Sequence, residues 1–84
     1  MTTLLAEARA GGYAVGYFEA WDLPSLEAVV EAAEAERAPV VLGFGCLLVD
    51  RSWLDAGGIE TLGRIGRPLA EQARVPTCLL LNEA

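Results

Sequence analysis

The order of elements around residues 22–45 is the feature that most constrains the fold. Residues 22–37, "DLPSLEAVVEAAEAER", place apolar side chains at the i, i+3, i+4 and i+7 positions of a helix, with acidic side chains opposite them. Pro39 stops this helix, and the wholly apolar run "VVLGFG" at 40–45 follows at once. A strand that is apolar on both faces is typical of a parallel sheet that is covered on both sides. This segment therefore predicts a helix that leads directly into a buried parallel strand.

The same alternation continues on both sides of this segment. It predicts a helix at 2–10, a strand at 13–18, a second long helix at 58–74 and a third strand at 75–81. Pro68 lies inside the second long helix, so we expect a kink or break near 64–67. Strands that alternate with helices favour right-handed crossovers and a parallel sheet. The sequence therefore predicts an α/β fold in which an N-terminal helix precedes a parallel β-α-β-α-β unit.

The hydrophobic content is too high for such a unit to stand alone. Of the 84 residues, 54% are hydrophobic, whereas average usage is roughly 45–50% even when glycine is counted. A chain of this length buries only about 60–65% of the surface that its unfolded form exposes. Two helices can cover one face of three strands, and we expect the other face to be bare Val, Leu and Phe. This face predicts burial against a partner subunit or against the rest of a larger domain.

Charge and cysteine content exclude several classes of function. The net charge of −6 argues against nucleic acid as a partner and against anionic membrane surfaces. No apolar run reaches the ~20 residues of a membrane span, and the opening "MTTLLAEARAGG" lacks the basic region of a secretory signal. Cys46 and Cys78 lie in apolar runs and predict buried free thiols in a reducing cytoplasm. Because the chain has no His and no CxxC, no self-contained zinc site is expected.

Two long stretches resemble a known family. The stretches "GGYAVGYFEAWDLPSLEAVVEAAEAERAPVVLGF" (11–44) and "AGG…PLAEQARVPTCLLL" (56–81) are similar in order and spacing to the opening of class II, metal-dependent fructose-bisphosphate and ketose-bisphosphate aldolases. The resemblance implies a (β/α)8 TIM barrel, a fold of about 250 residues whose active sites lie at the C-terminal ends of the strands. Residues 1–84 are then expected to form a single partial domain, the first third of that barrel and a fragment of a longer protein.

The resemblance also implies site positions at three strand ends. The family has Phe-Asn after its first strand, with the Asn contacting substrate, where this chain has Phe18 and Glu19. At the end of the second strand the family has a Ser that helps to hold a substrate phosphate, where this chain has Gly45. At the end of the third strand the family has Asp-His, the proton-transfer acid and a metal ligand, where this chain has Asn82 and Glu83.

These differences change the chemistry that is expected. An amide cannot transfer a proton as a carboxylic acid does, but Asn82 can still orient a substrate at the catalytic position. Glu83 is the candidate metal ligand, for zinc by resemblance or for magnesium or manganese because a carboxylate suits harder ions. We do not expect the fragment alone to bind the ion. Glu19 and Gly45 are candidate substrate-binding positions, although Glu19 is negative where an anionic substrate is expected and Gly45 offers only its backbone N–H. A solvated acid or a turn residue is the structural alternative at these positions.

Arg51 is the candidate contact for an anionic substrate group, and a surface ion pair with Asp50 or Asp55 is its alternative role. From the resemblance, we expect the parent protein to be a lyase that carries out metal-dependent aldol cleavage or condensation of a ketose phosphate, ketose bisphosphate or related sugar. The fragment itself is expected to be inactive. The alternative is a catalytically inactive, aldolase-like binding or assembly module that oligomerises through its exposed sheet face. We expect a homo-oligomer in the cytoplasm.

Overall fold

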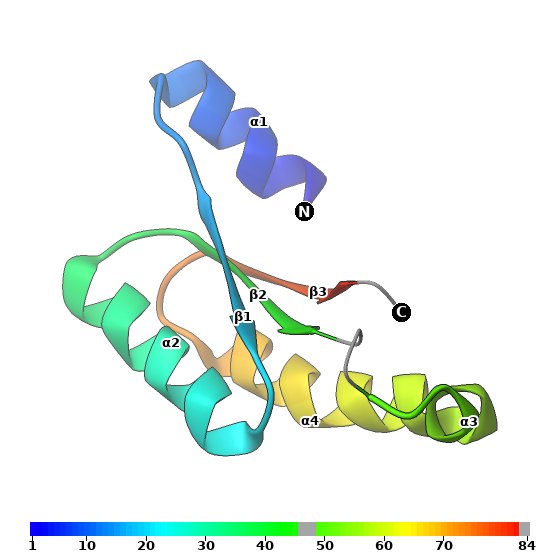
Figure 1. The fold of residues 1–84 in the computed structure, drawn as a ribbon. Coiled ribbons are helices and arrows are strands. Elements are labelled where there is room, and N and C mark those ends of the chain that lie inside the picture. Colours follow the sequence, from blue (N-terminus) through cyan, green and yellow to red (C-terminus); the bar gives the residue numbers. More distant parts are fainter. Residues whose placement is uncertain (46–48, 83–84) are drawn as a thin grey trace.

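The computed structural model describes residues 1–45 and 49–82. The elements are α1 (Thr2–Gly11), β1 (Gly16–Ala20), α2 (Leu23–Glu36), β2 (Val40–Gly45), α3 (Arg51–Trp53), the π-helical segment η1 (Leu54–Gly58), α4 (Ile59–Gln72) and β3 (Thr77–Asn82). The three strands are parallel and lie in the order β1-β2-β3 (Figure 1). The predicted fold class is therefore confirmed: an N-terminal helix precedes a parallel β-α-β-α-β unit, the arrangement with which an aldolase-type TIM barrel starts.

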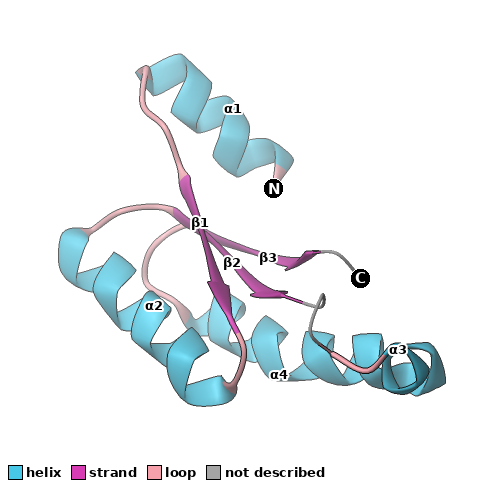
Figure 2. Ribbon diagram, viewed as in Figure 1, coloured by secondary structure: helices cyan, strands magenta, loops and turns pink. Residues whose placement is uncertain are grey.

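The core lies between the sheet and the two long helices, which cover the same face of it (Figure 2). It combines side chains from β1, β2 and α2, namely Ala20, Val40, Leu42, Phe44, Leu26, Val30 and Ala33, and residues of α4 and β3 pack around them. Leu26 and Leu42 are fully buried, and burial of each leucine side chain stabilises the fold by about 1.5–3 kcal/mol. The face under α2 and α4, here called the closed face, is therefore a complete hydrophobic layer.

A capping box fixes the turn between β1 and α2. The backbone N–H of Ser25 donates to the Asp22 carboxylate at 2.8 Å, and the backbone N–H of Asp22 donates to the Ser25 hydroxyl oxygen at 3.2 Å. Hydrogen bonds from the Ser25 side chain and then from its backbone hold the pKa of Asp22 below its ordinary value. The chain therefore leaves the carboxyl end of β1 in a defined direction.

The first strand differs from its predicted position of 13–18. It begins at Gly16 and ends at Ala20, because pairing with β2 starts at Gly16 opposite Val40 and ends at Ala20 opposite Phe44. Tyr13 is exposed and precedes the pairing. As a consequence Glu19 lies inside the strand near its carboxyl end, where its side-chain direction is set by the sheet.

The predicted kink near 64–67 is wrong. The helix α4 runs through Pro68 without interruption, and the departure from helical geometry falls earlier, at Ala56 (φ −87°, ψ 16°) and Gly57 (φ 108°). A positive φ of this size suits glycine. Pro68 removes only the hydrogen bond to the carbonyl of Arg64, and both residues are exposed, so water can satisfy that carbonyl.

The face of the sheet opposite α2 and α4, here called the open face, is not the bare Val, Leu and Phe surface that was expected. Because side chains alternate along a strand, it carries Tyr17, Glu19, Val41, Gly43, Gly45, Cys78, Leu80 and Asn82. Both phenylalanines face the helices instead. Cys78 is a free, half-buried thiol rather than a buried one, since it lies on this face, and Cys46 is outside the described residues.

The first helix lies on the other side of the sheet from α2 and α4 (Figure 2). Its Leu4 and Ala8 are buried, and it shares a hollow with the start of β3 at Thr77 and Cys78. Gly12 ends this helix in the left-handed conformation, with φ of 70°. Among the helices of the described residues, none is long and apolar enough to cross a membrane.

Candidate functional site

The structure brings together two of the predicted site residues, Glu19 and Asn82. The side-chain amide of Asn82 donates a hydrogen bond to Oε1 of Glu19 at 2.9 Å. The register places Glu19 of β1 opposite Gly43 of β2, and Asn82 of β3 opposite Gly45. The hydrogen bond therefore spans the central strand on the open face, near the carboxyl ends of all three strands.

A third side chain joins this pair. The hydroxyl of Tyr17 donates a hydrogen bond to the same oxygen of Glu19 at 3.1 Å. Tyr17 lies two residues before Glu19 and therefore on the same face of β1. Two donors from two different strands hold one carboxylate oxygen, and hydrogen bonds to a charged acceptor are stronger than neutral ones. The Glu19 side chain, although exposed, is thus oriented by the fold.

The two glycines of the central strand make room for this arrangement. A Cβ atom at Gly43 would lie 2.6 Å from the Tyr17 hydroxyl oxygen and would also collide with the backbone carbonyl of Leu80. A Cβ atom at Gly45 would collide with the carboxylate of Glu19, with Oε2 as its nearest neighbour. Gly45 is thus matched to Glu19, because any larger residue at position 45, serine included, would displace that side chain.

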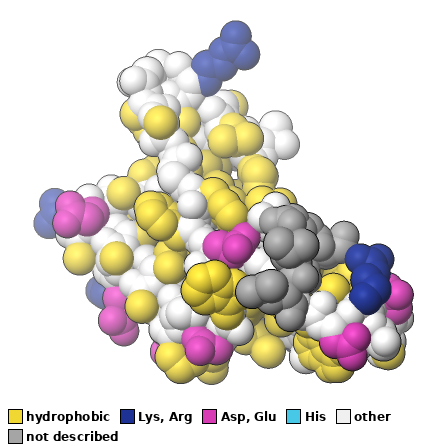
Figure 3. Space-filling model, viewed as in Figure 1, with side chains coloured by type: hydrophobic (Ala, Val, Ile, Leu, Met, Phe, Trp, Pro, Cys, Tyr) yellow, Lys and Arg dark blue, Asp and Glu magenta, His cyan; other side chains and the backbone are white. Residues whose placement is uncertain are grey.

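Arg51 does not join Tyr17, Glu19 and Asn82, here called the strand-end group. It begins the short helix α3 and forms an ion pair with Asp55, Nε to Oδ1 at 3.3 Å, between side chains that are 67% and 61% exposed. Asp50 instead accepts a hydrogen bond from the backbone N–H of Ser52. The surface ion pair with Asp55 is therefore the geometry observed, and a substrate contact through Arg51 stays a prediction. In the view of Figure 3, basic side chains lie at the periphery, while an acidic side chain lies among apolar ones near the centre.

The described residues do not form a metal site by themselves. Within residues 1–45 and 49–82, no three His, Cys, Asp or Glu side chains lie close enough together to hold an ion. The carboxylate of Glu19 accepts hydrogen bonds from an amide and a hydroxyl, which is how a carboxylate is satisfied without a cation. Glu83, the predicted ligand, lies outside the described residues. Its role as a ligand stays a prediction.

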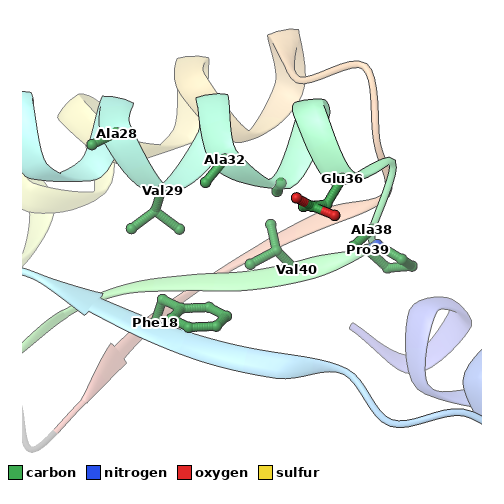
Figure 4. Close-up of a pocket in the computed structure, with 9 residues that line it drawn as sticks. Phe18, Ala28, Val29, Ala32, Glu36, Ala38, Pro39 and Val40 are labelled. Atoms are coloured by element: carbon green, nitrogen blue, oxygen red, sulfur yellow. The ribbon is translucent and has the colours of Figure 1, made fainter.

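A second hollow lies on the closed side, between α2 and the edge of β1. It measures about 370 Å³ and is lined by apolar side chains and one acid, Glu36. Figure 4 shows Phe18 and Val40 on the strands facing Val29 and Ala32 on the helix. This apolar hollow offers a surface for packing and few groups for chemistry, so the candidate site is the strand-end group of Tyr17, Glu19 and Asn82.

The sequence analysis identified Glu19, Gly45 and Asn82 but missed Tyr17 and the contact that links Glu19 with Asn82. The two-residue alternation of a strand was the signal for Tyr17, since it places position 17 on the same face as position 19. The hydrogen bond across the central strand has no signal in the sequence, because it depends on the register of three strands.

Comparisons with known proteins agree with this architecture. The sequence model of the family described as "Fructose-bisphosphate aldolase class-II" matches residues 1–82. The chain is 35% identical over 75 residues to the probable fructose-bisphosphate aldolase of Bacillus subtilis (strain 168), an alignment that covers 89% of this chain and 25% of that protein. It is 33% identical over 82 residues to the 6-phospho-5-dehydro-2-deoxy-D-gluconate aldolase of Halalkalibacterium halodurans, with coverage of 98% and 27%.

A third relative is the fructose-bisphosphate aldolase of Thermus caldophilus, which is 35% identical over 79 residues, with 94% of this chain and 24% of that protein covered. The chain spans about a quarter of the length of the curated relatives that it matches. Its fold, its strand order and these matches lead to one conclusion. The chain belongs to the class-II fructose-bisphosphate aldolase family.

Proposed function

We propose that residues 1–84 form one partial domain of a class II aldolase-type barrel, and that this barrel breaks or forms the carbon–carbon bond next to the carbonyl of a ketose phosphate. The observation that carries the proposal is the hydrogen bond between Glu19 and Asn82 on the open face. In a (β/α)8 barrel the crossover helices, here α2 and α4, lie outside, so the open face is the interior, and active sites lie at the carboxyl ends of the strands. The strand-end group occupies that position.

The substrate class is proposed from the names of the relatives. Two are named as fructose-bisphosphate aldolases, one of them as probable, and one as a 6-phospho-5-dehydro-2-deoxy-D-gluconate aldolase, so a phosphorylated sugar is the common element. Asn82 would orient a substrate hydroxyl through its amide, and the backbone N–H of Gly45 and the guanidinium of Arg51 are the proposed contacts for an anionic group. Glu19, whose carboxylate lies against Gly45, repels such a group electrostatically, which favours Arg51 over Gly45 as the phosphate contact.

Glu83 is proposed as one oxygen ligand of a divalent ion, zinc by resemblance or magnesium or manganese by the chemistry of a carboxylate. Its remaining ligands would come from barrel elements outside residues 1–84, because the described residues gather no cluster of three donors. We propose that the 84-residue segment by itself neither retains the ion nor turns over substrate.

The partial-domain proposal has support at the edge of β1. Phe18 is 55% exposed there, and it lines the apolar hollow against α2. In a closed barrel β1 has a second neighbouring strand, and a helix of the outer ring packs next to α2. The hollow is where that helix would pack, which accounts for apolar side chains that the described residues leave uncovered.

The test is a retro-aldol assay of the protein expressed from its complete reading frame. Fructose 1,6-bisphosphate and 6-phospho-5-dehydro-2-deoxy-D-gluconate are supplied separately, with zinc, magnesium or manganese added, and the released carbonyl products are measured. We expect turnover of at least one sugar, and metal retained after dialysis. No turnover of either sugar together with no retained metal would refute the proposal.

A second candidate function is a non-catalytic binding or assembly module that forms a homo-oligomer through the open face. The observation in its favour is the exposure of large apolar side chains on and beside the sheet, including Trp21 at 70% and Leu80 at 38%. Sedimentation velocity of residues 1–84 at micromolar concentration tests it: a well-folded monomer would exclude the assembly module and would also contradict the partial-domain proposal. The cytoplasmic location inferred from the free thiols belongs to both candidates and is likewise proposed.

A further inference from the structure

We propose that Glu19 is the catalytic proton-transfer residue of the strand-end site and that Tyr17 and Asn82 are its positioning residues. This inference rests on the proposed aldol function and goes beyond it, because it moves the acid–base chemistry from the third strand to the first. Three observations carry it: the chemistry of the open face, the orientation of the carboxylate, and the space above Gly45.

The chemistry of the open face leaves one candidate among the described residues. Its side chains are apolar, amide, phenol or thiol except at position 19. An amide cannot donate and accept a proton as a carboxyl group does, so Asn82 cannot carry the transfer. Glu19 is the carboxylate of this face, and it lies near the carboxyl end of its strand, where a barrel holds its substrate.

The orientation of the carboxylate separates its two oxygens. Both hydrogen bonds, from Tyr17 and from Asn82, are accepted by Oε1. Oε2 is the atom that lies over Gly45, where no side chain intervenes. A general base must come within hydrogen-bond reach of the proton that it removes. The fold therefore fixes one oxygen and presents the other above the central strand.

The proposed step balances without a co-reactant. In the cleavage direction Oε2 accepts the proton of the substrate hydroxyl on the carbon beside the bond that breaks. That carbon and its oxygen become a carbonyl group, the carbon–carbon bond breaks, and its electron pair stays on the ketone half as an enolate. The enolate carbon then takes up a proton from water, and the carboxylic acid of Glu19 returns its proton to solvent, so that no net proton is consumed. In the synthetic direction the same acid protonates the new alkoxide.

The experiment uses the protein from its complete reading frame with the same two sugars, and measures kcat and kcat/KM against pH. Glu19→Gln keeps the size of the side chain and removes the base. We expect kcat to fall by about 10²–10⁴-fold, the usual effect of a general acid–base group, and the acid limb of the kcat/KM profile to disappear. Because Gln has nearly the same shape as Glu and can still accept the hydrogen bonds from Tyr17 and Asn82, folding should be preserved, which circular dichroism checks. Glu60→Gln, at an exposed ion pair on α4, is the matched control and should match wild type.

Asn82→Asp distinguishes the first strand from the third. If Glu19 is the base, a second carboxylate at hydrogen-bond distance disfavours the charged form of the base by like-charge repulsion, so the acid limb moves to higher pH and the rate at neutral pH falls. If position 82 carries the transfer instead, this variant raises the rate, which would overturn the inference. Tyr17→Phe should shift the acid limb with a rate loss of a few-fold, because it removes one of the two donors to Oε1.

These measurements distinguish failure of the role proposed for Glu19 from failure of the proposed aldol function. Wild-type turnover together with an unchanged pH profile in Glu19→Gln overturns the role of Glu19 and leaves the aldol function standing. A wild-type protein that cleaves neither sugar overturns both proposals. Loss of rate and of the acid limb in Glu19→Gln, with Glu60→Gln at the wild-type level, supports both.

Discussion

On the closed face of the sheet, β2 places Val40, Leu42 and Phe44, which are 3%, 0% and 3% exposed. On the open face the same strand places Val41, Gly43 and Gly45. Large side chains fill the space under the helices, whereas glycines leave space over which Tyr17 and Glu19 lie. The six-residue strand β2 thus packs against the helices with one face and leaves room for the polar side chains of the strand-end group on the other. Substitutions on the closed face should therefore mainly lower the stability of the fold, whereas substitutions on the open face should mainly change the geometry of the site.

The largest effect is expected for Leu42→Ala on the closed face. The side chain is fully buried in the core cluster, so its truncation loses transfer free energy and leaves a cavity, at a cost of about 2–5 kcal/mol of unfolding free energy. Urea unfolding monitored by circular dichroism measures this change. Leu80→Ala on the open face, where the leucine is 38% exposed, is the control and should cost clearly less. Equal losses for the two variants would contradict the comparison of the faces.

A smaller and more informative difference is expected within the open face, between Gly43→Ala and Gly45→Ala. The added methyl group at 43 meets the backbone carbonyl of Leu80, which cannot move aside, and such overpacking costs about 1–3 kcal/mol. The atoms nearest to the methyl group at 45 belong to the Glu19 side chain, which can rotate, and not to the backbone. Stability should then change little while the carboxylate moves.

Denaturant unfolding of both glycine variants measures the stability part of this prediction. The nuclear magnetic resonance shift of the Asn82 side-chain amide measures the site part, since that amide donates to Glu19. We expect the amide signal to move in Gly45→Ala. An unmoved signal would show that Gly45 does not determine the position of Glu19.

The difference between the closed face and the open face also explains which parts of the structure could be predicted from the sequence. The closed face follows from local patterns: the apolar spacing in residues 22–37 and the run at 40–45 predict α2 and β2 almost to their ends. The arrangement of side chains on the open face depends on the register of the three strands. Positions 19, 45 and 82 could therefore be identified only through the family resemblance, as three separate differences from the residues of that family. The structure joins them, since Glu19 contacts Asn82 and occupies the space above Gly45.

The prediction of a kink near 64–67, made from Pro68, was wrong for a related reason. A local rule assigns a penalty to proline within a helix, but that penalty depends on whether the carbonyl that loses its partner is buried. In α4 both Pro68 and Arg64, whose carbonyl loses its partner, are exposed residues, so the helix continues, and the break occurs at Gly57, where the positive φ is available to glycine. Whether one carbonyl group is buried depends on how the whole molecule packs, and the local sequence pattern does not contain this information.

The carboxylate of Glu34 can be compared with that of Glu19, because it also accepts two hydrogen bonds, but these join two elements of the fold. Glu34 of α2 accepts hydrogen bonds from the backbone N–H of Arg74 at 2.8 Å and from its Nε at 3.4 Å. This contact joins the end of α2 to the loop that leads into β3, at the amino ends of the strands. Glu19 is held at the opposite ends of the strands, near Asn82.

The smallest expected effect is that of Glu34→Gln on thermal stability. The backbone hydrogen bond from Arg74 holds the pKa of Glu34 below its ordinary value of 4.5. A lowered pKa means that the contribution is complete above pH 4.5 and is lost as pH falls through the lowered value. We therefore expect a lower Tm than wild type at pH 7 and a difference that shrinks to nothing in acid. Glu27→Gln, at an exposed position of the same helix, is the control. A Tm difference that persists in acid would show that Glu34 acts through packing and not through its charge.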